Sequence, residues 1–352
     1  MSKMLEETRE QPAALARTLE EGVAGLGELR RHFGLNRPKL VVLVARGTSD
    51  NAAQFGRYLI EITTSIPVSL AAPSVVTLYE SQLDLNGVLV VGVSQSGEST
   101  DTNAVLADAR RRGAITVGIT NEPASTMAGI SNFVLRVRAG AEESVAATKT
   151  YTCQLMALYL LAHALGGSVD IDVLRRIPGW VDCVLQLEDS IELIAERYTF
   201  MTRAVTVGRG LNYANALELG LKLMETCYVV AERFSAADLM HGPIAMVEHA
   251  FPVFVFAPPG VTWPCISEVI DRLKELKAET LVITDLDNRY ASDKAARLIQ
   301  IPLRTAVNGA SEDLYTAIPY IVPAQLFAAH LAWIKGLNPD RPRALHKITL
   351  TM

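Results

Sequence analysis

Hydroxyl side chains gather in two short segments, each after a run of β-branched residues. Gly47-Thr48-Ser49 follows the apolar run 40–45, and Ser-Gln-Ser-Gly-Glu-Ser-Thr at 94–100 follows the run 88–93. A helical pattern begins after each. Small hydroxyl residues, a glycine and the free N–H groups of a helix N-terminus together offer a cradle for a phosphate group. Serine and threonine also cap helices without any ligand, but two such turns at one sheet edge favour a phosphate site.

Two observations bear on how many such sites there are and what they bind. The sequence has no GxxxxGK[ST] loop, and Gly208-Arg209-Gly210 lacks the third glycine of a dinucleotide fingerprint, so a phosphosugar is expected rather than a nucleotide. The matching place in the second half, 257–260, reads Ala-Pro-Pro-Gly. It has no hydroxyl, and its prolines lack N–H groups. One phosphate site per chain is therefore expected.

Candidate acid–base groups lie in the second half and at the C-terminal end. Glu218, Lys222 and Glu225 have i, i+4, i+7 spacing and share one helical face. That spacing alone is typical of a surface ladder of ion pairs, each worth about 0.3–0.5 kcal/mol. By themselves, His241 in a His-Gly-Pro segment would be structural, and Lys347 would be a solvated tail lysine.

The elements that must position these groups occur twice. Arg46-Gly47 and Arg209-Gly210 each follow an apolar run and are offset by 209 − 46 = 163 residues. Later runs repeat with offsets of 166 (Ile115 to Leu281) and 165 (Phe133 to Leu298). Each half predicts strand, helix, strand, helix, strand, strand, helix. Near-continuous Val/Ile/Leu runs are typical of strands buried on both faces of a parallel sheet, which predicts doubly wound α/β sandwiches with ligands beyond the strands' carboxyl ends.

The expected organisation has five parts. They are an N-terminal helical arm (1–35), a first α/β domain (36–167), a helical linker (168–202), a second α/β domain (203–338) and a tail over the active site (339–352).

Composition excludes several classes of protein. Hydrophobic residues make up 49% of the 352 residues and charged residues 20%, which excludes a disordered chain. The net charge of −5 argues against a nucleic-acid binder. Mean hydropathy is high, +0.21, but the uncharged stretches 150–169 and 314–334 contain polar residues or prolines and predict buried helices rather than membrane spans.

The remaining composition signals predict a cytoplasmic protein without metal or cofactor. No apolar secretion signal occurs in 1–21, and the four cysteines are widely spaced without a CxxC pair, as in a protein with reduced thiols. The six histidines form no HExxH or other ligand spacing.

An ordered set of motifs resembles tandem SIS (sugar isomerase) modules. The motifs are Gly47-Thr48-Ser49, the segment 94–99, Ala-Ala-Thr-Lys at 146–149, the segment 218–225, His241-Gly242-Pro243 and Lys347. Over about residues 35–352 the chain is similar to the isomerase half of glutamine–fructose-6-phosphate aminotransferases and to stand-alone SIS-type glucosamine-6-phosphate deaminases. The resemblance implies two flavodoxin-like, three-layer α/β/α SIS domains in tandem.

The resemblance also implies a binding site for a hexose 6-phosphate. The residues expected to bind the phosphate and sugar hydroxyls are Thr48, Ser49, Ser94, Gln95, Ser96 and Ser99, with backbone contacts from Val145 and pocket-shaping by His346. The family usually has threonine where Ser99 stands, commonly serine where Ala147 stands, and a small residue where His346 stands.

The catalytic roles come from the same resemblance. Glu225 is implied as the base that moves a proton between C1 and C2, oriented by Glu218 and Lys222. His241 is implied to open the sugar ring, donated across the interface of a homodimer. Lys347 is implied to reach the C1–C2 region as a Schiff-base or hydrogen-bonding group.

The expected reaction is deamination. Position 2 is Ser2 rather than a nucleophilic cysteine, and no glutaminase-like segment precedes the first SIS unit, so glucosamine 6-phosphate and water are expected to give fructose 6-phosphate and ammonia. One alternative is a deglycase or isomerase acting on another hexose 6-phosphate derivative. The other is a non-catalytic phosphosugar sensor.

Overall fold

The computed structural model describes residues 2–303, 313–345 and 347. The chain forms two compact units. The N-terminal unit comprises Glu10–Glu143, Ala147–Arg175 and Ala344–Met352. The C-terminal unit comprises Met1–Arg9, Ser144–Ala146 and Arg176–Arg343.

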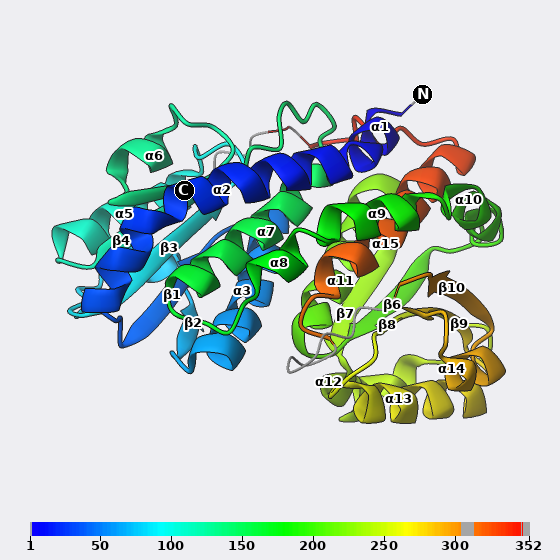
Figure 1. Cartoon of the computed structure of the whole chain (residues 1–352). Coiled ribbons are helices and arrows are strands. Elements are labelled where there is room, and N and C mark those ends of the chain that lie inside the picture. The colour runs from blue at the N-terminus through cyan, green and yellow to red at the C-terminus, as the bar shows by residue number, and fades with distance from the viewer. Residues whose placement is uncertain (1, 304–312, 346, 348–352) are drawn as a thin grey trace. The chain divides into compact units, whose positions relative to one another are not determined.

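The N-terminal unit contains a five-stranded parallel sheet of order β2-β1-β3-β4-β5 (Figure 1). Its strands are β1 (Leu40–Val44), β2 (Val68–Leu70), β3 (Val88–Ser94), β4 (Ile115–Thr120) and β5 (Phe133–Arg136). Central strand β3 is buried at every position, as its unbroken apolar sequence predicts for a strand covered on both faces.

Helices cover both faces of this sheet. They are α2 (Gln11–Leu35), α3 (Thr48–Thr64), α4 (Ser74–Thr77), α5 (Thr100–Arg111), α6 (Thr126–Ile130), α7 (Lys149–Ala164) and α8 (Ile171–Leu174). Helices α5 and α6 pack on the face that presents Gly92, where a Cβ would lie 2.4 Å from Leu106. Helices α3 and α7 pack on the other face, and α2 lies against α7 (Figure 1). The result is a three-layer sandwich.

The C-terminal unit repeats this topology. Its parallel sheet has the order β10-β9-β8-β6-β7, so the first strand again lies between the second and third. The strands are β6 (Arg203–Gly208), β7 (Val230–Ser235), β8 (Pro252–Ala257), β9 (Glu279–Asp285) and β10 (Arg297–Ile301). The predicted fold class, two doubly wound α/β sandwiches in tandem, is confirmed.

The helices of the C-terminal unit also form two layers. They are α1 (Lys3–Arg9), α9 (Ile177–Leu185), α10 (Glu188–Glu196), α11 (Tyr213–Cys227), α12 (Ala236–Met240), α13 (Trp263–Glu275), α14 (Arg289–Lys294) and α15 (Ala317–Ile334), with 3₁₀ turns at Gly210–Asn212 and Pro243–Met246. Helix α13 packs on one sheet face. Helices α11 and α15 pack together on the other, where Phe327 contacts Phe254.

The predicted strand count was wrong by one in each half, because β2 and β7 were not anticipated. Both are edge strands. Strand β2 has only three residues, and β7 contains Glu232 and Arg233, which interrupt its apolar pattern. An edge strand contacts one neighbour only, so it needs less apolar sequence than a central strand.

The two uncharged stretches form buried helices, as predicted. In α7, all residues but His163 are buried. Helix α15 is the one helix in the described part of the chain that is long and apolar enough to cross a membrane, but 89% of that window is buried in the structure. Its neighbours α9, α10 and α11 belong to the same unit. The high mean hydropathy is thus explained by buried core helices as well as by the buried strands.

Candidate functional site

The two hydroxyl-rich turns lie side by side at the carboxyl edge of the N-terminal sheet. Strands β1 and β3 are hydrogen-bonded neighbours, and the chain leaves their carboxyl ends for α3 and α5. In the order β2-β1-β3-β4-β5 this is the point where the winding direction reverses. Ligands of doubly wound sheets bind at such switch points. The topology therefore brings Thr48 and Ser49 close to residues 94–99.

The conformation of the second turn, residues 94–99, is fixed by its own hydrogen bonds. The Gly97 N–H donates to Ser94 Oγ (3.1 Å), and the Glu98 N–H donates to Ser96 Oγ (3.2 Å). Gly97 has a φ of +67°, and a Cβ there would lie 2.2 Å from Ser125 Oγ. Only glycine fits this backbone without strain.

Neither helix N-terminus uses its N-cap residue for side-chain capping. Gly47 precedes α3 and has no side chain, and Ser99 precedes α5 without a side-chain bond to the backbone; its Oγ lies 3.1 Å from Thr102 Oγ1. Simple capping by serine therefore does not explain Ser99. The first turns of two helices, of 17 and 12 residues, face the same edge and favour an anion through their dipoles.

Two further contacts fix the positions of the turns. Arg46 donates from Nε (3.1 Å) and Nη2 (2.5 Å) to Asp101 Oδ2, which joins the turn after β1 to the first turn of α5. Gln154, buried on α7, donates from Nε2 to Ser49 Oγ at 2.9 Å. The Ser49 hydroxyl is thereby oriented from within the core.

The corresponding turn of the C-terminal unit lacks this chemistry. The segment after β8, residues 258–260, is Pro-Pro-Gly, and α13 follows with Thr262 at its N-cap. A Cβ on Gly260 would lie 3.0 Å from the Asp313 backbone nitrogen. The backbone of Asp313 therefore lies close against this turn.

The second group of candidate residues is buried in the C-terminal unit. Lys222 Nζ lies 2.6 Å from Glu225 Oε2 and 3.4 Å from Glu218 Oε1. The side chains of Lys222 and Glu218 are 1% and 0% exposed, whereas that of Glu225 is 23% exposed. The surface ladder that spacing alone favours is therefore wrong. Of the two carboxylates that share the buried lysine, Glu225 is the one that solvent or a ligand can reach.

Glu225 and His241 occupy opposite ends of their unit. A helix that follows a parallel strand runs back toward the amino ends of the strands. Glu225 lies 12 residues after Tyr213, the first residue of α11, and so about 18 Å along the helix axis at 1.5 Å per residue. His241 is exposed and follows α12, just beyond the carboxyl end of β7. The topology of one unit does not bring these two side chains together.

The start of the C-terminal tail packs beside the end of α11. Tyr228 ends α11 in a left-handed conformation, with φ +54°. Arg343 lies over its ring, 4.1 Å from the centroid, and the Arg343 N–H donates to the Tyr228 hydroxyl at 2.9 Å. These two contacts fix Arg343 beside Tyr228, which follows Glu225 by three residues.

The remaining predicted residues are placed separately. Val145 belongs to the C-terminal unit, and its N–H donates to Asp340 O (3.1 Å), so its carbonyl is the backbone group left for a ligand. Lys347 belongs to the N-terminal unit and lies 3.0 Å from Glu142. His346 lies outside the described residues.

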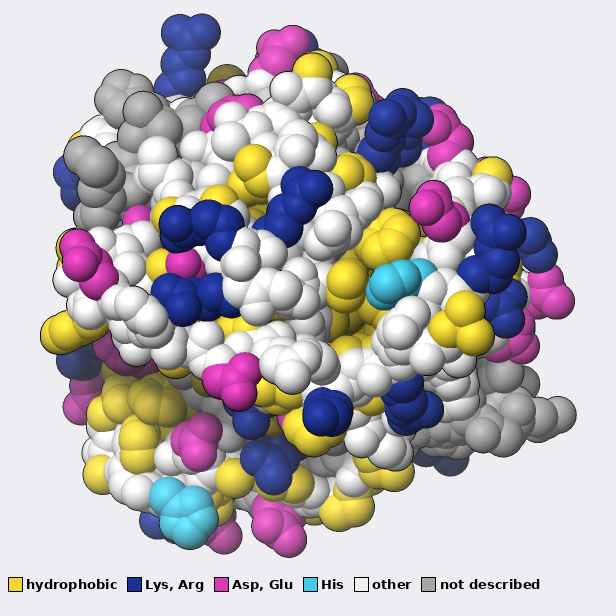
Figure 2. Space-filling model, turned by 90° about the vertical axis from the view of Figure 1, so that its left-hand side faces the viewer, with side chains coloured by type: hydrophobic (Ala, Val, Ile, Leu, Met, Phe, Trp, Pro, Cys, Tyr) yellow, Lys and Arg dark blue, Asp and Glu magenta, His cyan; other side chains and the backbone are white. Residues whose placement is uncertain are grey.

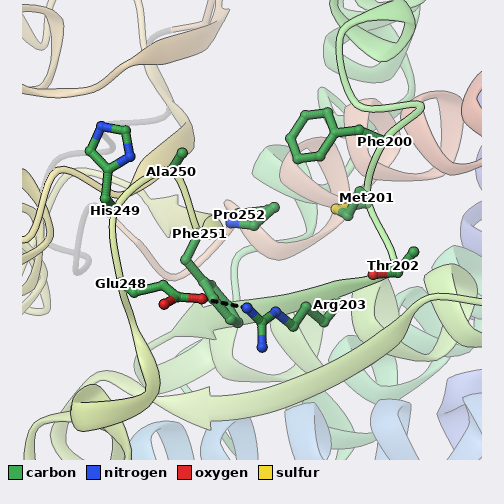
Figure 3. Close-up of a pocket in the computed structure, with 9 residues that line it drawn as sticks. All are labelled: Phe200, Met201, Thr202, Arg203, Glu248, His249, Ala250, Phe251 and Pro252. Carbon is green, nitrogen blue, oxygen red and sulfur yellow. Dashed lines mark hydrogen bonds and ion pairs between the residues drawn. The ribbon is translucent and has the colours of Figure 1, made fainter.

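Two surface pockets lie at the amino ends of the strands, one in each unit. One cavity, of about 190 Å³, lies where β6 and β8 begin. Among its lining residues, which Figure 3 draws, Arg203 pairs with Glu248 and lies over the Phe251 ring. Another, of about 320 Å³, lies where β1, β3 and β4 begin and includes His32 and Gly87. Neither contains a predicted site residue.

Surface charge and possible metal ligands indicate no additional site among the described residues. Basic and acidic side chains are interspersed on the described part of the face in Figure 2, without a continuous basic surface. No group of three or more His, Cys, Asp or Glu among the described residues could hold a metal ion. All four cysteines are unpaired by disulfides.

Sequence reasoning missed Arg46, Asp101, Glu142 and Gln154. Arg46 adjoins a recognised motif, which was a usable signal. Asp101, Glu142 and Gln154 contact Arg46, Lys347 and Ser49, which lie 55, 205 and 105 positions away in sequence. No local spacing could have predicted those contacts.

Comparisons with known proteins agree with this architecture. The family model described as "SIS domain" matches residues 34–164 and 201–335. A glutamine–fructose-6-phosphate aminotransferase (isomerizing) from Pyrococcus horikoshii is 39% identical over 355 residues, which cover 98% of this chain and 57% of that protein. The chain thus spans little more than half the length of this curated relative.

Solved structures give the same result. The C-terminal domain of glucosamine-fructose-6-phosphate aminotransferase from Francisella tularensis aligns with a TM-score of 0.86 and 27% identity, covering 97% of this chain and 98% of that one. Glucosamine-6-phosphate deaminase from Thermotoga maritima aligns with a TM-score of 0.75 and 23% identity, covering 99% and 100%. The latter likeness is one of fold alone.

Proposed function

Because the chain belongs to the SIS domain family and contains two SIS domains in tandem, we propose that it is an aldose–ketose isomerase of hexose 6-phosphates that acts as a glucosamine-6-phosphate deaminase. The name of the Pyrococcus relative includes fructose 6-phosphate and isomerisation, which supports the substrate class. The turns after β1 and β3 support a phosphate-binding role for Thr48, Ser49 and residues 94–99.

The observation that carries the proposal is the group formed by Glu218, Lys222 and Glu225. A base that abstracts a proton α to a carbonyl or imine must be fixed in place and still reachable. Glu225 fulfils both conditions, because the buried Lys222 ammonium holds one of its oxygens while 23% of its side chain stays exposed. Glu218, on the far side of the same lysine, fixes that ammonium.

The proposed reaction uses three groups in sequence. His241 transfers the proton between ring oxygen and the C1 hydroxyl that opens the sugar. Glu225 takes the proton from C2 of the open-chain aldehyde and returns it to C1, while one proton leaves the amino nitrogen and one is added to the aldehyde oxygen, which converts the 2-amino aldose into a 2-imino sugar with a hydroxyl at C1. Water adds to the imine carbon and ammonia leaves, giving fructose 6-phosphate. Lys347 donates hydrogen bonds near C1 and C2.

We further propose a cytoplasmic homodimer in which each protomer receives His241 from its partner. The placement of Glu225 near the end of α11 and of His241 beyond β7, at opposite ends of one unit, supports this assignment. Sedimentation equilibrium measures the oligomeric state. A mixture of inactive Glu225→Gln and His241→Ala proteins would regain activity by forming mixed dimers, whereas a site complete in one protomer predicts no recovery.

Ammonia release tests the function directly. Wild-type protein incubated with glucosamine 6-phosphate, without glutamine, is expected to produce equal amounts of ammonia and fructose 6-phosphate. Interconversion of fructose and glucose 6-phosphates without ammonia release would instead favour an isomerase on another derivative. Thermal stabilisation by hexose 6-phosphates without turnover or C2 hydrogen exchange would identify a sensor and refute the enzyme proposal.

A further inference from the structure

Glu142 is a buried carboxylate that sequence reasoning assigned no role. It precedes α7 by seven residues, and its side chain is 0% exposed. Its Oε1 accepts hydrogen bonds from the N–H groups of Thr148 (2.9 Å) and Thr150 (3.1 Å), and its Oε2 accepts one from Thr150 Oγ1 (2.6 Å). The N-terminal end of a 16-residue helix therefore holds the carboxylate in one orientation.

The fourth donor to Glu142 is Lys347. Its Nζ lies 3.0 Å from Oε2, and its side chain is 27% exposed. The two partners differ in how firmly they are held. Three bonds from Thr150 of α7 and from its N-cap Thr148 fix Glu142, whereas Lys347 follows α15 in a stretch whose described residues form no helix or strand. The carboxylate is thus the more firmly held partner of this ion pair.

Electrostatics support a charged pair. Burial by itself raises the pKa of Glu142, but the Lys347 ammonium together with the bonds from Thr150 and Thr148 outweighs burial and holds this pKa below its usual value. A buried carboxylate that stays ionised needs such partners. Its side chain is 0% exposed, so Glu142 itself has no surface to offer to a sugar.

We propose that Glu142 is a positioning residue that holds the Lys347 ammonium group at the N-terminal end of α7 and so sets where this lysine meets the open-chain sugar phosphate. The inference rests on the proposed function for the role of Lys347, but the pairing itself does not. Glu142 acts through Lys347 and is not itself a catalytic residue.

The first test measures the pairing without any substrate. Limited acetylation of amines with a water-soluble ester, followed by peptide mass spectrometry, reports how available each lysine is. Lys347 is expected to react several-fold faster in Glu142→Gln than in wild-type protein. Glu28→Gln, which changes an exposed carboxylate on α2 of the same unit, is the control and is expected to leave the rate unchanged. An equal Lys347 rate in wild-type and Glu142→Gln proteins would overturn the proposal.

A second variant protects this test against misfolding. Glu142→Asp keeps the charge and shortens the side chain by one methylene, so its carboxylate withdraws from Lys347. Melting temperatures establish which variants fold. If Glu142→Gln does not fold, Glu142→Asp is expected to show faster acetylation of Lys347 than wild-type protein. A wild-type rate in a folded Glu142→Asp protein would then overturn the proposal.

The activity test separates positioning from mere stability. Glu142→Gln is expected to lower kcat for glucosamine 6-phosphate with little change in KM, and Glu142→Asp to restore part of it. The double variant Glu142→Gln/Lys347→Gln is expected to match Lys347→Gln alone, because residues in one interaction do not act additively. Additive losses would overturn the role. If wild-type protein turns over no sugar, the proposed function fails, and acetylation alone decides the pairing.

Discussion

Lys222 Nζ lies 2.6 Å from Glu225 Oε2, and the lysine is buried while the glutamate is 23% exposed. Lysine is rarely buried without a partner. Here it lies between two carboxylates, Glu218 and Glu225, one turn before and one turn after it on α11. The buried ammonium is thus paired inside the unit, and one oxygen of the partly exposed Glu225 carboxylate is left for chemistry.

Replacing Glu225 by glutamine is expected to lower kcat for deamination about 10²- to 10⁴-fold, the usual contribution of a general base. The amide oxygen still accepts a bond from Lys222, so the melting temperature should change little. Steady-state ammonia release measures the effect. Glu196→Gln, an exposed carboxylate on α10, is the control and should retain wild-type activity; a Glu225→Gln protein as active as this control would exclude Glu225 as the base.

Replacing Lys222 by methionine is expected to lower the free energy of unfolding by about 3–5 kcal/mol, because it removes one partner of a buried ion pair. Urea titration followed by circular dichroism measures this. Lys274→Met, at an exposed position of α13, should change it by less than about 0.5 kcal/mol. Adding Glu218→Gln to Lys222→Met should recover part of the loss. A small loss in the single variant would show that the pair is solvated.

Gly97→Ala is expected to destabilise the protein by about 1–3 kcal/mol and to raise KM for the sugar phosphate, because φ is +67° and the new Cβ would meet Ser125. Thermal unfolding and steady-state kinetics measure the two effects. Gly129→Ala on α6 meets nothing within 4 Å. This control should be neutral or slightly stabilising.

Glu188 is expected to make stability depend on acid pH. Burial raises its pKa, but the hydrogen bonds and charge of Arg9, with a contribution from His330, outweigh burial and lower it. A folded-state pKa below the unfolded value of about 4.3 stabilises the protein above that pH, and the contribution is lost as pH falls through the folded value. As the pH is lowered from about 7 to about 3, the melting temperature should fall less steeply for Glu188→Gln than for wild-type protein.

Thiol reactivity is expected to distinguish the four cysteines. Burial raises the pKa of Cys153 to about 12 and that of Cys227 to about 11, so neither forms much thiolate near neutral pH. Cys183 is exposed. Iodoacetamide at pH 8, about half a unit below an ordinary thiol pKa, should label Cys183 first and the two buried cysteines only after unfolding in urea. Fast labelling of Cys153 in the native protein would contradict its burial.

The sequence by itself determined the duplicated fold. Val/Ile/Leu runs at 40–45, 88–93 and 115–120 predict central parallel strands, because helices bury both faces of such strands. Their repetition 163–166 residues later predicted the second sandwich. The sequence also placed Thr48, Ser49 and residues 94–99 at one sheet edge, since parallel strands share the edge where they end. Strands β2 and β7 were not predicted, because β2 has only three residues and Glu232 and Arg233 interrupt the apolar pattern of β7.

Only the tertiary structure decided how the charged groups are used. The spacing of Glu218, Lys222 and Glu225 is the same in a solvated ladder and in a buried group, and only the packing of α11 against α15 and the sheet distinguishes them. Likewise, Lys347 reads as a solvated tail residue until Glu142, 205 positions earlier, is found beside it. Local sequence sets backbone conformation and periodicity, but the burial and partners of a charge depend on which distant segments enclose it.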